Sequence, residues 1–132
     1  MNQLTNDLLK DFSRQLQSRR EDLLTQISAQ LSPEGRERLR GVHGSTHDQG
    51  DESVAALLAD LGIAAIRAEA AELADIEGAL NRINNHTFGV CVDCGKEIAL
   101  ARLQAYPTAK RCLACQQKYE DTRGGKDSTP SL

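Results

Sequence analysis

The sequence has no tryptophan and few other aromatic residues, with 2 phenylalanines and 2 tyrosines in 132 residues. Aromatic side chains bury large areas, so this composition argues against a large compact core. No apolar run approaches the roughly 20 residues of a membrane-spanning helix. The N-terminus also lacks the charged and then apolar pattern of an export signal. We therefore expect a protein that acts neither in a membrane nor outside the cell.

An excess of positive charge is also missing. The chain has 16 Lys and Arg against 19 Asp and Glu, and its formal net charge is -3. DNA binding depends on clustered cations that displace counterions from phosphates. In residues 88–120 the basic side chains are offset by acidic side chains and by cysteines. We therefore expect a protein partner rather than sequence-specific DNA, and a DNA-binding protein remains the alternative.

All 4 cysteines fall in two C-x-x-C motifs, and their positions are Cys91, Cys94, Cys112 and Cys115. This spacing is typical of one tetrahedral metal site that takes two thiolates from each of two turns. Zn²⁺ prefers such a site, and four protein ligands leave no position for a catalytic water. Gly95 supports a metal knuckle because glycine accepts a positive φ. We predict one structural Zn²⁺ and no enzymatic activity; an Fe(Cys)₄ site or an iron–sulfur cluster would use the same ligands.

Other roles fit the cysteines and histidines less well. Disulfides belong to exported proteins, and a thioredoxin-type motif needs a βαβ pattern that is missing here. Paired free thiolates without an export signal indicate a reducing cytoplasm. The spacing of the three histidines, His43, His47 and His86, does not match that of metal ligands. We therefore interpret them as ordinary polar residues.

Two stretches have helical periodicity. In residues 1–41 an apolar stripe consists of Leu4, Leu8, Phe12, Leu16, Leu23, Ile27 and Leu31. Within it, Ser32 and Pro33 predict a short break and a helix restart that Ser32 caps. In residues 52–84 the apolar residues have heptad-like spacing, and they are Val54, Leu57, Leu61, Ala65, Leu73, Ile76, Leu80 and Ile83. The glycine-rich residues 41–53 predict a turn between two antiparallel helices.

These patterns predict a mainly α fold, in which a long antiparallel coiled-coil hairpin is attached to a small four-cysteine zinc finger with a short C-terminal helix. We assign residues 1–85 to the hairpin, with its tip at about 42–53. Residues 86–120 form the finger, on which the extreme N-terminus could pack. Residues 121–132 are expected to be a disordered tail. We expect a monomer.

Four segments resemble the DksA/TraR family of bacterial zinc-finger transcription regulators. They read ELADIEGALNRI at 72–83, TFGVCVDCG at 87–95, ARLQAYPTA at 101–109 and CLAC at 112–115. With the layout of the preceding hairpin, the resemblance covers about residues 1–120. The chain is most similar to the longer, DksA-like branch.

The resemblance implies binding to RNA polymerase, with the coiled-coil tip in the secondary channel near the catalytic Mg²⁺. The acidic tip pattern of the family, D-x-x-D-x-A, falls here on Asp48, Asp51 and Ser53, where Ser53 replaces the alanine. From the turn alone, Asp48 and Asp51 would be interpreted as helix caps. A degenerate member that binds polymerase without altering initiation is a further alternative.

The resemblance also bears on the alarmone ppGpp, to which DksA responds through basic side chains. The matching positions here are Asp75, Tyr106 and Gln116, and none of them is basic. An acidic group repels a polyphosphate. We therefore expect weak or no dependence on ppGpp.

Overall fold

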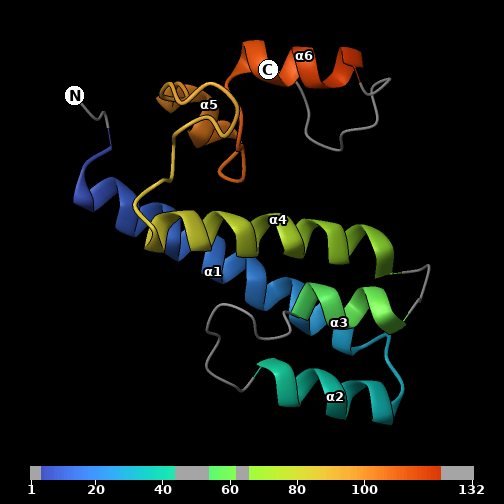
Figure 1. Cartoon of the computed structure of the whole chain (residues 1–132). Coiled ribbons are helices and arrows are strands. Elements are labelled where there is room, and N and C mark those ends of the chain that lie inside the picture. The colour runs from blue at the N-terminus through green and yellow to red at the C-terminus, as the bar shows by residue number, and fades with distance from the viewer. Residues whose placement is uncertain (1–3, 44–53, 62–65, 123–132) are drawn as a thin grey trace. The chain divides into compact units, whose positions relative to one another are not determined.

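The computed structural model describes residues 4–43, 54–61 and 66–122, and this part of the chain is mainly helical (Figure 1). Outside the helices, one isolated antiparallel bridge joins Val90 and Glu97. Among the described residues, no helix combines the length and the apolar character that crossing a membrane requires. The predicted fold class is confirmed. The helices are α1 (Asn6–Ser28), α2 (Pro33–His43), α3 (Val54–Leu61), α4 (Arg67–Asn84), α5 (Leu100–Ala105) and α6 (Leu113–Thr122).

The chain forms two compact units. One consists of residues 1–16 and 78–132, and the other of residues 17–77. Both α1 and α4 contribute to both units, because each division falls inside a helix. The predicted boundary at residue 85 stays a prediction.

In the unit of residues 17–77, α1 and α4 run antiparallel beside each other (Figure 1). Arg19 of α1 makes a bidentate ion pair with Glu72 of α4, with N–O distances of 2.6 and 2.9 Å. Arg20 pairs with Glu77 at 3.5 Å, and both of these side chains are largely buried. The opposite directions of the two helices in this unit confirm the antiparallel arrangement that the sequence predicts (Figure 1).

Apolar packing between the helices forms the core of this unit. Leu23, Ile27, Leu73 and Ile76 are at most 1% exposed, which confirms the predicted core face of each helix. Burying a side chain of this size contributes about 1.5–3 kcal/mol. α2 and α3 also pack on each other. Further buried residues of this unit are Leu24, Leu31, Leu39, Val54, Leu57, Leu58 and Ile66.

The predicted break before Pro33 is present. α1 ends at Ser28, and α2 begins at Pro33. The hydroxyl of Ser32 accepts a hydrogen bond from the backbone N–H of Gly35 at 3.1 Å, which is the predicted N-cap. Proline costs nothing at this position because its missing N–H would have no partner inside the helix.

The predicted second helix over residues 52–84 is described as two helices, α3 and α4. Ile66 forms a 3₁₀ turn directly before α4, while Gly62 and Ala65 lie outside the described residues. The end of the helix at Asn84 agrees with the prediction. The tip residues Asp48, Asp51 and Ser53, and residues 123–132 of the predicted tail, also lie outside the described residues.

The Arg19–Glu72 pair makes stability depend on pH. The hydrogen bond from Arg19 holds the pKa of the Glu72 carboxyl below its ordinary value of 4.5. A carboxyl with a lowered folded-state pKa stabilises the fold above its unfolded-state pKa, and this contribution disappears as pH falls through the folded-state value. Glu72→Gln should therefore lower stability at neutral pH, by at most about 1 kcal/mol because both side chains are substantially exposed.

Thermal unfolding followed by circular dichroism from neutral pH to about pH 3 checks this prediction. The difference between wild type and Glu72→Gln should shrink as pH falls below the ordinary carboxyl pKa of about 4. Glu37→Gln, which removes a carboxylate paired with Arg40 within α2, is the matched control. A Glu72→Gln difference that stays the same at about pH 3 would contradict the prediction.

Candidate metal centre

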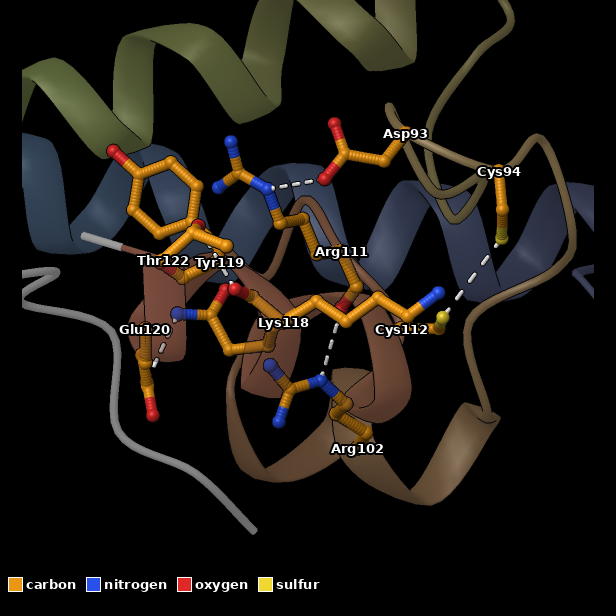
Figure 2. Close-up of polar contacts among 10 residues, drawn as sticks. Asp93, Cys94, Arg102, Arg111, Cys112, Lys118, Tyr119, Glu120 and Thr122 are labelled. Carbon is orange, nitrogen blue, oxygen red and sulfur yellow. Dashed lines mark hydrogen bonds and ion pairs between the residues drawn. The ribbon is translucent and has the colours of Figure 1, made fainter. Parts of the chain in front are cut away.

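The four predicted ligands come together in one cluster. The sulfur atoms of Cys91, Cys94, Cys112 and Cys115 all lie within 4.8 Å of one another. Cys94 Sγ and Cys112 Sγ are 3.8 Å apart, as the dashed line in Figure 2 shows. Four Zn–S bonds of about 2.3 Å in a tetrahedron require neighbouring sulfurs about 3.8 Å apart. The donor set and its spacing therefore fit Zn²⁺, and the four cysteines are a C4 zinc site.

The first knuckle is a tight turn around Cys91 and Cys94. The backbone N–H of Cys91 donates to Lys96 O at 2.8 Å, and that of Gly95 donates to Cys91 O at 3.0 Å. Gly95 has a φ of +77°, while a side chain there would meet nothing within 4 Å. Glycine is thus needed for its backbone conformation rather than for space, as the sequence predicts.

The second knuckle leads into α6. Cys112 directly precedes the helix, and Cys115 lies in its first turn. The backbone N–H of Gln116 donates to Cys112 O at 2.9 Å. This confirms the predicted short helix after the second C-x-x-C motif, and shows that the helix begins earlier than expected, at Leu113.

Helix α5 in the segment between the knuckles was missed by the sequence analysis. Its residues, LARLQA, are good helix formers, and Pro107 follows shortly after its end. The helix buries Leu103 and, unexpectedly, Arg102. A short helical run with one apolar side gives too little periodicity to be distinguished from a loop.

The thiols of the cluster differ in acidity. Burial raises the pKa of the Cys91 thiol, but backbone hydrogen bonds from Cys94, Cys112 and Asp93 outweigh burial and lower the pKa to about 6. The neighbouring thiol of Cys112 is the main cause that raises the pKa of Cys115 to about 12. Four thiolates cannot accumulate at this spacing without a cation, so metal binding must release protons from the cluster.

Two buried polar side chains of the finger were not identified from the sequence as site residues. Arg102 is 4% exposed, and its Nε donates to Arg111 O at 3.1 Å. Its Nη1 and Nη2 have no hydrogen-bond partner among the described residues. A buried guanidinium is costly unless negative charge lies nearby, and Zn²⁺ with four thiolates carries a net charge of about −2. The buried Arg102 is thus consistent with a dianionic centre.

Gln116 is the second buried polar side chain and is fully inaccessible to solvent. Its Nε2 donates to Glu120 Oε2 at 3.0 Å, one turn further along α6. The other two positions associated with ppGpp, Asp75 in α4 and Tyr106 after α5, are half-buried. These positions therefore present no exposed cation.

The start of the finger packs on the N-terminal residues of the same unit. The rings of Phe12 and Phe88 lie with their centroids 5.2 Å apart at an angle of 49°. Gly89 has a φ of +82°, and a Cβ atom there would lie 2.6 Å from Leu4 Cδ1. A larger residue at position 89 would be strained at this positive φ and would require the Leu4 side chain to shift. Of the histidines, His86 is exposed and has a φ of 62°, as expected for a polar turn residue.

A pair of antiparallel helices and a closed four-cysteine finger define a helical zinc-finger protein whose metal is structural. Residues 86–121 match the family described as the prokaryotic dksA/traR C4-type zinc finger. Over the zinc finger, this match confirms the resemblance to the DksA/TraR family that the sequence shows.

Among curated proteins, the chain is 44% identical over 45 residues to the RNA polymerase-binding transcription factor DksA of Escherichia coli (strain K12), covering 34% of this chain and 30% of the relative. It is 39% identical over 56 residues to an uncharacterized protein of Aquifex aeolicus (strain VF5), covering 42% of this chain and 39% of the relative. The matched part therefore spans well under half the length of these relatives.

Two solved structures are similar over most of the chain. Transcription factor DksA2 from Pseudomonas aeruginosa has a TM-score of 0.60 at 21% identity, covering 90% of this chain and 88% of its own. The RNA polymerase binding protein and transcriptional regulator Dks from Chlamydia trachomatis has a TM-score of 0.54 at 23% identity, covering 91% and 95%. At these identities the similarity shows a shared fold.

Removal of zinc should open the finger, because the binding energy of a structural zinc is folding energy in a small four-cysteine module. After treatment with a chelator, we expect amides of residues 86–120 to exchange quickly with solvent, while those of residues 17–77 keep their protection. Hydrogen exchange read by mass spectrometry, with zinc restored as the control, makes the comparison. Protection of residues 86–120 that persists without metal would show that the metal is dispensable for folding.

Proposed function

We propose that this protein is a non-enzymatic transcription factor that binds RNA polymerase. The observation that carries the proposal is the zinc finger itself, whose four cysteines converge and whose sequence matches the dksA/traR C4-type finger. In addition, 45 residues of the chain are 44% identical to a transcription factor named for polymerase binding. The closed metal site leaves no coordination position for a substrate. Near-neutral charge in the finger favours a protein partner over sequence-specific DNA. We propose that it works in the cytoplasm as a monomer.

We further propose that the protein acts through the secondary channel of polymerase, with Asp48, Asp51 and Ser53 at the tip that modulates initiation. These residues belong to the segment that connects α2 to α3, and the described parts of these two helices pack on each other. The two aspartates match the acidic positions of the family pattern, while Ser53 departs from it. An acidic group near a catalytic Mg²⁺ can alter metal binding without being a catalyst.

The test of the tip is transcription in vitro from a ribosomal promoter. Replacement of both carboxylates, by Asp48→Asn with Asp51→Asn, should leave polymerase affinity within about twofold and remove most of the transcriptional effect, because the change retains size but not charge. Asp11→Asn, which removes an exposed carboxylate from α1, is the matched control.

Two outcomes would contradict the role of the tip. An equal loss of affinity and effect would mean that the aspartates serve binding or folding. An unchanged effect of the double variant would favour a family member without tip activity. Salt-dependent binding of the wild type to bare DNA, without polymerase, would instead favour a DNA-binding zinc finger.

We propose that the response to ppGpp is weak or absent. A polyphosphate needs accessible cations, and the matching positions offer an acidic Asp75, a half-buried Tyr106 and a fully buried Gln116. The amide of Gln116 already donates to the carboxylate of Glu120. Desolvating a phosphate beside carboxylates is unfavourable.

Titration of ppGpp into the same transcription assay tests this proposal. With wild-type protein, inhibition should change by less than about twofold over the titration, which corresponds to less than about 0.5 kcal/mol of coupling. Asp75→Lys with Tyr106→Lys, which places two cations at these positions, should increase the response. Strong synergy between ppGpp and the wild type would refute the proposal.

A further inference from the structure

Arg111 connects three parts of the finger (Figure 2). Its guanidinium Nε donates to Asp93 Oδ2 at 2.8 Å. The guanidinium carbon lies 3.9 Å from the centroid of the Tyr119 ring in α6. Its backbone oxygen accepts the hydrogen bond from the buried Arg102 at 3.1 Å.

The positions of these residues relate the ion pair to the metal. Asp93 lies between the ligands Cys91 and Cys94 of the first knuckle, and Arg111 directly precedes the ligand Cys112 of the second. The Arg111–Asp93 pair therefore joins the two knuckles through side chains. A backbone hydrogen bond from Val92 N–H to Lys110 O, 2.9 Å long, joins the same two segments.

The environment of Arg111 makes this pair stronger than an ordinary surface ion pair. The Arg111 side chain is only 11% exposed, although that of Asp93 is 46% exposed. Stacking on Tyr119 holds the planar guanidinium in place, so little side-chain entropy is lost when it binds the carboxylate. The bond from Arg102 also fixes the backbone at Arg111. Exposed pairs that lack such support contribute little.

We propose that Asp93, Arg111 and Tyr119 form a knuckle link that positions the two halves of the zinc site and slows the loss of metal. Arg111 is a positioning residue in this link, because it acts on the metal only through the ligands on each side. Zinc leaves as its sulfur ligands detach one after another. A link across the knuckles keeps a detached sulfur close to the ion, where it binds again at high effective concentration. Side chains outside the ligand set commonly influence metal affinity in this way.

The rate at which zinc is released from the metal-loaded protein to an excess of a chromogenic chelator tests the link. Asp93→Asn and Arg111→Ala should each speed zinc release about tenfold. This is the lower end of the effect expected for side chains that support a metal site from outside the ligand set. The double variant should be at most about threefold faster than the faster single variant, because both changes break one interaction. Glu97→Gln, which removes an exposed carboxylate from the same finger, is the matched control and should stay within about twofold of wild type.

Two further measurements separate positioning from folding. Cobalt-loaded Asp93→Asn should keep the absorption bands of tetrahedral thiolate coordination, because the link supplies no ligand. Arg111→Lys keeps the charge but not the planar stacking, so its release rate should fall between those of wild type and Arg111→Ala.

Four results would overturn the proposal. The first two are zinc release within about twofold of wild type in both single variants, and single-variant effects on the release rate that multiply in the double variant. The third is loss of the cobalt–thiolate bands in Asp93→Asn. The fourth is a release rate of Arg111→Lys equal to that of Arg111→Ala.

Discussion

The convergence of four thiolates on one ion is the constraint on which the finger depends. Its apolar contribution is small, because among the described residues its buried apolar side chains are mainly Phe88, Ile98, Leu103 and Ala109. One bridge and two short helices add few backbone hydrogen bonds that could hold the segment alone. A module of this size and composition gains its folding energy from the metal. Neighbouring thiols, with Cys112 first among them, raise the pKa of Cys115, so the sulfurs oppose one another's ionisation when no cation is bound.

The finger also contains buried polar groups that a hydrophobic core would exclude. Arg102 is buried and Arg111 nearly so, and both belong to the segment that carries the second knuckle. Buried guanidinium groups need negative charge, and the carboxylate of Asp93 supplies it to Arg111. The unit of residues 17–77 is built in the opposite way. There, leucine and isoleucine side chains fill the core, and the ion pairs of Arg19 and Arg20 join α1 to α4.

The features predictable from the sequence are those that depend on neighbours along the chain. Ligand spacing, the Ser32 cap, the need for glycine at position 95 and the apolar faces of the long helices all follow from local geometry. The knuckle link could not be predicted, because Asp93, Arg111 and Tyr119 are far apart in the sequence and meet only in the folded finger. The burial of Gln116 could not be predicted either, because one glutamine on a short helix does not reveal which side of the helix packs inward. Helix α5 was missed because six residues are too few to establish a period.

The construction of the finger restricts how the proposed regulator can act. The cysteine thiolates supply all four ligands of a tetrahedral metal, and the neighbouring Arg111 is engaged with Asp93. Such a centre offers neither an open coordination site nor an exposed cation at the buried Gln116. Under the proposed function, the finger is therefore a support, and the groups that alter initiation must lie elsewhere in the chain. The segment with Asp48 and Asp51 meets this requirement in the sequence. Carboxylates act on a metal-dependent enzyme through charge alone, so they need correct placement by the helices and no chemistry of their own.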